Sequence, residues 1–154
     1  ATSSRDAATA NAADPILTHP KTGARVFVGD ERAAKSEPLL RAKKVSRIVN
    51  CQGKRGRNFF ENKGSGTFEC EYYRFDVAGF HDVDGICDAG DDHEQRADET
   101  ACALGGNESK AVAFFAPVFA WIDAQLEQGE SVLIHCLAGA HRAGCTGVAY
   151  MMWW

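Results

Sequence analysis

The residues best placed to do chemistry lie in one short stretch, "SVLIHCLAGAHRAGCTG", residues 131–147. Cys136 supplies a thiol, whose thiolate is a strong nucleophile. Arg142 supplies a planar cation with a fork of donors that can bind two phosphate oxygens at once. Gly139 lies between them and permits a tight backbone approach, and His135 can order the loop by hydrogen bonding. These residue types favour nucleophilic attack on a bound oxyanion.

The elements around this stretch suit the same chemistry. Residues 131–136 form an apolar run typical of a central strand, and a helical pattern begins at Arg142. A strand that leads through a tight loop into a helix presents loop amides and the positive end of the helix dipole to an anion. The sequence therefore predicts an oxyanion-binding loop between Cys136 and Arg142.

The rest of the chain alternates between strand and helix patterns. Strands are predicted over residues 25–30, 45–51, 68–77 and 131–136, and helices over 36–44, 109–129 and from 142 onward. Val112 and further apolar residues at three- and four-residue steps mark the long helix, and Pro117 should kink it. We expect a single α/β domain with a central, mostly parallel sheet flanked by helices.

The ends of the chain differ from this pattern. Residues 1–23 begin with an Ala/Ser/Thr-rich segment and are interpreted as a disordered lead-in, so that residues 24–154 form the domain. The last residues, "AYMMWW", lie within an apolar helical pattern, and we expect a domain truncated at its C-terminus. A cytoplasmic location is expected, or an organelle if the N-terminus is the remnant of a transit peptide.

Composition narrows the function further. The formal net charge of −4 argues against nonspecific nucleic-acid binding, and no apolar run approaches the length of a membrane span. The six cysteines include no CxxC pair and no paired spacing typical of metal ligands. No cofactor is expected. The oligomeric state is left open.

The stretch resembles the signature of the cysteine-based protein tyrosine phosphatase superfamily, His-Cys, five residues, Arg. The order of predicted elements agrees, and the Leu-Ala-Gly filling is similar to the dual-specificity phosphatase branch. The resemblance implies a loop of the form Cys-x5-Arg that lies between a central strand and a helix. Its phosphate-binding residues would be Leu137, Ala138, Gly139, Ala140, His141 and Arg142.

The resemblance also implies a mechanism without a metal. Cys136 would attack phosphorus to form a phosphocysteine, while Arg142 and the loop amides hold the equatorial oxygens. An aspartic acid would protonate the leaving oxygen and then deprotonate the attacking water. Asp82 is the first candidate for this acid, because the loop that carries it follows the strand at 68–77. Asp84 and Asp98 remain alternatives in the long acidic stretch.

Ala143 departs from the pattern of many relatives, which place Ser or Thr after the arginine. That hydroxyl helps the thiolate leave in the second step, and losing its hydrogen bond is worth about one to two decades of rate. Alanine also occurs there in active relatives, including plant starch-glucan phosphatases, whose Ala-Tyr-Met-aromatic run resembles residues 149–153. The identity of this residue therefore does not imply an inactive protein.

Phosphotyrosine or phosphoserine/threonine in proteins is the first substrate class, because the loop lacks the lysines typical of phosphoinositide phosphatases. A phosphoglucan phosphatase and a phospho-binding pseudophosphatase are the alternatives. A rhodanese-like sulfur carrier also uses a cysteine in an amide-lined loop, but rarely has an arginine at the matching position.

Two further features have functional and structural interpretations of similar weight. Cys51 matches a cysteine that, in a phosphoinositide phosphatase of the superfamily, forms a disulfide with the nucleophile, so a reversible Cys51–Cys136 disulfide is one hypothesis. A packed core cysteine is the other. Lys54, Arg55 and Arg57 in "GKRGR" either flank the mouth of the active site and attract an anionic substrate or form a solvated loop.

Overall fold

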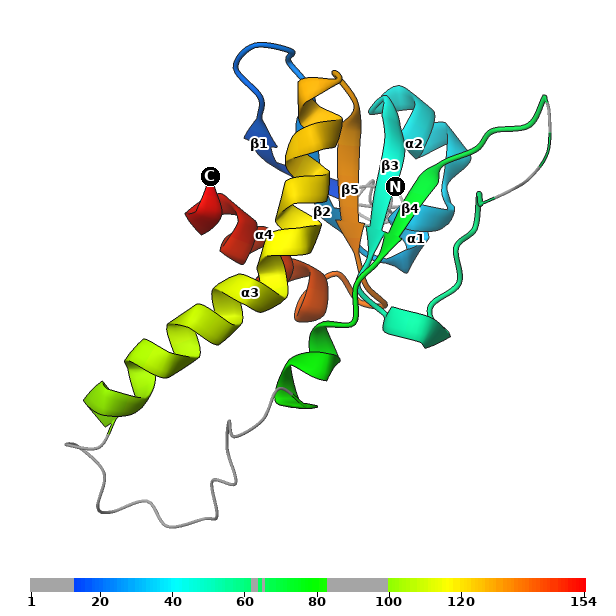
Figure 1. Cartoon of the computed structure of the whole chain (residues 1–154). Helices are drawn as coiled ribbons and strands as arrows, with labels where there is room; N and C mark the ends of the chain where they lie inside the picture. Colours follow the sequence, from blue (N-terminus) through cyan, green and yellow to red (C-terminus); the bar gives the residue numbers. More distant parts are fainter. Residues whose placement is uncertain (1–12, 62–63, 65, 83–99) are drawn as a thin grey trace, which may run out of the picture.

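The computed structural model describes residues 13–61, 64, 66–82 and 100–154, which form an α/β domain on a five-stranded sheet (Figure 1). The strand order is β1-β2-β5-β3-β4. β1 pairs antiparallel with β2, and the other pairs are parallel. The strands are β1 Ala13–Thr18, β2 Arg25–Gly29, β3 Val45–Asn50, β4 Glu71–Arg74 and β5 Ser131–His135. The predicted fold class, with the strand that precedes the cysteine at its centre, is confirmed.

Helices cover both faces of the sheet. The α-helices are α1 Glu31–Lys35, α2 Glu37–Ala42, α3 Thr100–Glu127 and α4 Arg142–Trp153, and the 3₁₀ helices are η1 Gly53–Arg55 and η2 Val77–Asp82. Side chains cap the two short helices, since Asp30 accepts from the Ala33 amide at 2.8 Å and Ser36 from the Leu39 amide at 3.4 Å. Of the described helices, none is long and apolar enough to cross a membrane.

The side chains of β5 divide between two cores. Leu133 packs with Phe27 and Leu40 in the core beneath α1 and α2. Val132 and Ile134 point the other way, into the core beneath α3 and α4. Successive strand residues face opposite sides of the sheet, so His135 faces the α1 side and Cys136 the α3 and α4 side. The loop that follows Cys136 thus begins where both cores end.

The structure differs from the sequence analysis at four points. Residues 13–18 form β1, so the part of the predicted disordered lead-in that the structure describes contains an edge strand. The helix α1 was not predicted, and α3 begins at Thr100 rather than at residue 109. Val112 is 52% exposed and lies outside the core.

Pro117 lies inside α3, and Figure 1 shows that this helix bends partway along its length. Proline lacks an amide hydrogen and clashes with the preceding turn, which is a common cause of such bends. The C-terminal half of the helix lies over the sheet, with Val118, Phe119, Ile122 and Leu126 buried. The expected disturbance in this helix is therefore visible.

Candidate active site

Cys136 follows the last residue of β5 directly, and Arg142 is the first residue of α4. The Cys136 side chain is almost fully buried, at 2% exposure, whereas Leu137, Ala138, Ala140 and His141 are exposed. The six residues 137–142 thus make the short strand-to-helix connection that the sequence predicts. The residues predicted to bind phosphate are these six, which follow Cys136 directly.

Two contacts hold this loop against the start of α1. The Leu137 carbonyl accepts a hydrogen bond from the Glu31 amide at 3.3 Å. Gly139 has a left-handed backbone, with φ +73°, and a Cβ added there would lie 2.9 Å from the Gly29 carbonyl carbon and 3.0 Å from the Asp30 nitrogen. Only glycine combines this φ with such a close backbone approach. The loop is therefore shaped by the junction between β2 and α1.

The loop presents unused donors. None of the amides of residues 137–141 donates a hydrogen bond to the described part of the chain. The Arg142 guanidinium likewise has neither an ion pair nor a hydrogen bond with a described residue. The helix that starts at Arg142 runs for 12 residues and adds the positive end of its dipole. Free amides, a free guanidinium and a helix N-terminus together suit an oxyanion.

His135 is fully buried directly before Cys136, and neither of its ring nitrogens has a hydrogen-bond partner among the residues described. Burial lowers the pKa of His135 to about 4, and the Cys136 backbone, Glu31 and Asp30 oppose this shift only in part. The imidazole is therefore neutral at physiological pH. It supports the loop from the α1 side as an uncharged ring.

Thr146 is a residue of this site that the sequence reasoning missed. It is buried one turn into α4, and its hydroxyl donates to the Arg142 carbonyl at 2.8 Å. Its Oγ1 also lies 3.6 Å from the Cys51 sulfur. The sequence does place this threonine four residues after Arg142, a spacing that would have indicated the contact with the Arg142 carbonyl. Ala143, also fully buried, offers no hydroxyl.

Cys51 and Cys136 are both free thiols in the same core. The Cys51 amide donates to the His135 carbonyl at 2.8 Å, which joins the ends of β3 and β5. Burial raises the pKa of the Cys51 thiol to about 12, so this residue stays a protonated thiol near neutral pH. A disulfide forms by attack of a thiolate, so the raised pKa of Cys51 does not favour a Cys51–Cys136 disulfide. That disulfide stays a prediction.

The candidates for the general acid lie at the edge of the described chain. Asp82 is the last residue of η2, and this short helix lies beside α4 (Figure 1). Asp84 and Asp98 fall outside the described residues. The backbone that carries Asp82 is thus adjacent to the helix that carries Arg142. The assignment of the acid itself stays a prediction.

No group of three or more His, Cys, Asp or Glu residues in the described chain could hold a metal ion. The donors around Cys136 are instead amide N–H groups and a guanidinium, which bind anions rather than metal cations. The site as described is therefore built to receive an anion.

Comparison with known proteins agrees with this geometry. Residues 26–153 match the family "dual specificity phosphatase, catalytic domain". No match to a curated protein sequence was found. Among solved structures, the chain is similar to the human tyrosine phosphatase-like serine/threonine/tyrosine-interacting protein, with 19% identity and a TM-score of 0.46. That similarity covers 83% of this chain and 68% of the human chain.

The match to the family spans most of the chain and includes the whole loop from Cys136 to Arg142. The chain therefore belongs to the dual specificity phosphatase catalytic domain family, within the cysteine-based protein tyrosine phosphatase superfamily. Its function is of the protein phosphatase type.

Proposed function

We propose that this chain hydrolyses phosphate monoesters on tyrosine, serine or threonine side chains of proteins through a phosphocysteine intermediate. The observation that carries the proposal is the set of donors in the loop after Cys136, namely the amides of residues 137–141 and the Arg142 guanidinium, none of which has a partner among the described residues. These groups would bind the three non-bridging oxygens of the phosphate. The sulfur would then lie behind phosphorus, opposite the leaving oxygen.

In the first step, the thiolate of Cys136 forms a bond to phosphorus while the bond to the ester oxygen breaks. A carboxylic acid, proposed to be Asp82, gives its proton to that oxygen, and the alcohol or phenol leaves. In the second step, the resulting carboxylate takes a proton from water. The water oxygen bonds to phosphorus, and the Cys136 thiolate leaves, which releases inorganic phosphate.

The direct test is turnover of p-nitrophenyl phosphate by the wild-type chain and by Cys136→Ser and Arg142→Lys variants. We expect Cys136→Ser to have no activity above background, because serine is a much weaker nucleophile at neutral pH. We expect Arg142→Lys to lose at least about 100-fold in kcat/KM, since lysine cannot form the planar two-point contact. Equal rates for wild type and Cys136→Ser would refute the proposal.

A second measurement separates enzyme from binding protein. Rapid mixing with p-nitrophenyl phosphate should show release of nitrophenol followed by steady turnover. Nitrophenol released once per chain without further turnover would instead mean that the phosphocysteine is not hydrolysed. That outcome would contradict the hydrolase proposal while leaving the nucleophile in place.

A further inference from the structure

The basic segment "GKRGR" leaves β3 at the same edge of the sheet as the nucleophile. Asn50, the last residue of β3, lies opposite His135 in the register, and the next residue, Cys51, is hydrogen-bonded to the His135 carbonyl. Gln52 follows, and its amide side chain lies 3.5 Å from Glu31, whose backbone amide binds the Leu137 carbonyl. The 3₁₀ helix η1, Gly53–Arg55, therefore begins beside the catalytic loop (Figure 1).

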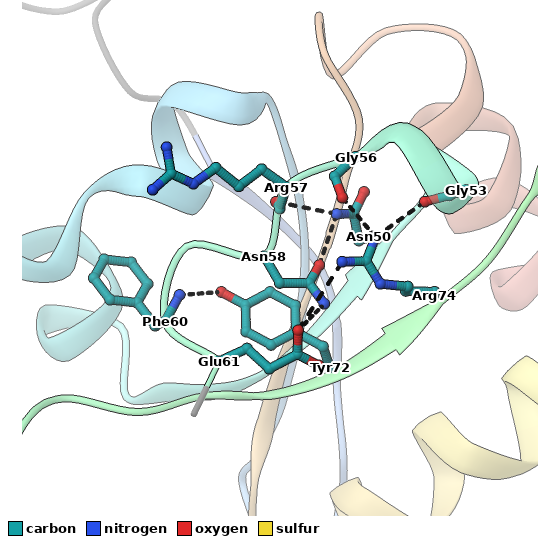
Figure 2. Close-up of polar contacts among 9 residues, drawn as sticks. All are labelled: Asn50, Gly53, Gly56, Arg57, Asn58, Phe60, Glu61, Tyr72 and Arg74. Carbon is teal, nitrogen blue, oxygen red and sulfur yellow. Dashed lines mark hydrogen bonds and ion pairs between the residues drawn. The ribbon is translucent and has the colours of Figure 1, made fainter. Parts of the chain in front are cut away.

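A buried asparagine fixes the path of this segment. Asn50 is fully buried, and its side-chain Nδ2 donates to the Arg57 carbonyl at 3.2 Å and to the Asn58 side chain at 2.9 Å (Figure 2). Its Oδ1 accepts from the Gln52 amide at 3.0 Å. The amide group of one side chain thus binds both the start and the end of the segment, which a merely solvated loop does not require.

Arg74, on the neighbouring strand β4, holds the segment from the other side. Its Nη1 donates to the carbonyls of Gly53 at 3.2 Å and Gly56 at 2.5 Å, and its Nη2 lies 4.0 Å from Glu61 (Figure 2). A Cβ added to Gly56 would lie 2.5 Å from the Gln52 Cβ. The segment is therefore a closely packed turn with a defined shape.

The cations of this turn are not equivalent. Lys54 and Arg55 are exposed, and within the described chain their side chains form no ion pair or hydrogen bond. Arg57 is also exposed, but it lies over the Phe59 ring, 5.8 Å from its centroid, and Figure 2 shows its guanidinium directed away from Gly53. Lys35 is paired with Glu31.

Among the residues that the structure describes, the acid Asp76 lies against the turn, since a Cβ on Gly53 would lie 2.8 Å from its carboxyl carbon. A single carboxylate does not neutralise two cations. Lys54 and Arg55 thus leave positive charge on a fixed turn beside the loop that ends at Arg142.

We propose that Lys54 and Arg55 form a second anion subsite, which selects phosphoprotein segments that carry another acidic group close to the phosphate to be hydrolysed. The acidic group is a carboxylate or a second phosphate on the same peptide. This inference rests on the proposed function of the site at Cys136. A phosphorylated glucan, which is otherwise neutral, would gain nothing from this subsite.

The test compares four substrates with the full chain and with Lys54→Ala/Arg55→Ala. The substrates are p-nitrophenyl phosphate and three peptides that contain the same phosphotyrosine. In the first peptide the neighbouring residues are neutral, in the second they are glutamates, and the third carries a second phosphate. For the wild type we expect KM for the acidic and doubly phosphorylated peptides to be lower than for the neutral one. The double variant should raise only those two KM values, by about fivefold, with kcat unchanged.

Added salt should reproduce the loss in the wild type, because exposed charges are screened. The matched control is Lys21→Ala/Arg25→Ala, which removes two exposed cations where the β1–β2 hairpin enters β2, away from the carboxyl ends of the parallel strands. It should keep the wild-type preference. Binding of the same peptides to Cys136→Ser by calorimetry gives a readout independent of turnover.

The two proposals can fail separately. Two results would overturn the second subsite alone, provided that p-nitrophenyl phosphate is turned over normally. In the first, the wild type has the same KM for all three peptides. In the second, the KM values differ between the peptides by the same factor in the wild type and in the double variant. A lower KM for only one of the two charged peptides would show whether the second anion is a carboxylate or a phosphate. Absence of any Cys136-dependent turnover would overturn the proposed function, and equal affinity of Cys136→Ser for all peptides would then overturn the subsite as well.

Discussion

Ala143 is fully buried in the first turn of α4, in the same core as Cys136. A hydroxyl at this place could donate to the departing thiolate, and alanine has no such donor. We expect Ala143→Ser to speed hydrolysis of the phosphocysteine by about tenfold or more, the rate equivalent of one hydrogen bond to a charged group.

Stopped-flow measurement of the burst and the steady rate checks this prediction. The burst amplitude should fall as the second step becomes faster, while the rate of the first step stays the same. Ala149→Ser, on the same helix but seven residues after Arg142, is the control and should change neither. An unchanged steady rate in Ala143→Ser would show that another group already assists the leaving thiolate.

His135 gives the stability of the protein a predictable dependence on pH. Its pKa is about 4 in the folded chain and 6.5 ordinarily, so the unfolded chain binds the proton first as the pH falls. The contribution of the neutral imidazole is therefore complete above pH 6.5 and is lost as the pH falls toward 4. The loss amounts to about 3 kcal/mol over that range.

Urea unfolding of wild type and His135→Leu at pH 7, 6, 5 and 4.5 measures this effect. Leucine does not titrate, so the variant should lose less stability than the wild type between pH 6.5 and 4. The carboxylates of Asp30 and Glu31 are common to both proteins and largely cancel in the difference. Parallel curves would mean that His135 is protonated in the folded state.

At the scale of the elements, the loop between Cys136 and Arg142 depends on the close approach of Gly139 to the β2–α1 junction. Gly139 and Gly23 have nearly the same backbone, φ +73° and +74°, but a Cβ on Gly23 would meet no atom within 4 Å. Alanine at either site costs about 1–2 kcal/mol of left-handed strain. Only Gly139→Ala also forces the loop away from Gly29.

We therefore expect Gly23→Ala to lose about 1 kcal/mol of stability and to keep its activity. Gly139→Ala should lose more stability and at least about 100-fold in kcat/KM, because displaced amides no longer match the phosphate. Urea unfolding and p-nitrophenyl phosphate kinetics on both variants test this pair. Similar activity in the two would show that the loop tolerates displacement.

Most elements that carry the site could be predicted from local sequence. The apolar run before Cys136 and the apolar helical pattern after Arg142 predict β5 and α4, because both patterns leave clear signals in the sequence. These two elements and a chemically specific motif also predict that Cys136 is the nucleophile. The five-residue helix α1 has too few residues for any period, although Asp30 is an ordinary N-cap.

Long-range partners of the site left no comparable signal. Nothing near Arg74 in the sequence indicates that it binds the turn at residues 53–58, since this contact depends on β3 and β4 meeting in the fold. The same holds for Thr146 and Cys51, which are 95 residues apart. Such contacts follow from the strand order, and local periodicity does not specify strand order. The contacts of Asn50 with Arg57 and Asn58 are closer in sequence, but they depend on the path of the turn, which no local period specifies.

The whole molecule depends on β1 more than its sequence indicates. Pro15 in "ADPILT" weakens the strand signal, yet proline is tolerated on an edge strand, where its missing amide need not pair. Ala13 is buried in the core beneath α1 and α2, whereas Ile16 packs against the core beneath α3 and α4. This strand therefore contributes to both sides of the sheet.

The position of α4 also depends on β1. A Cβ added to Gly147 would lie 2.6 Å from Val28 Cγ2 and 3.2 Å from Ile16 Cδ1, so the helix rests closely on β1 and β2. The same helix carries Arg142 at its first residue. Loss of β1 should thus reach the active site through α4 and also expose the edge of β2 to other chains.

Two chains that start at residue 13 and at residue 19 test this dependence, since they differ only by β1. We expect the shorter chain to lose at least about 2 kcal/mol of unfolding free energy, from the apolar area that Ile16 and Leu17 no longer bury. It should also scatter light at lower concentration and have a lower kcat/KM for p-nitrophenyl phosphate. Equal stability and activity of the two chains would show that β2 serves as an edge without β1, and that α4 needs no support from Ile16.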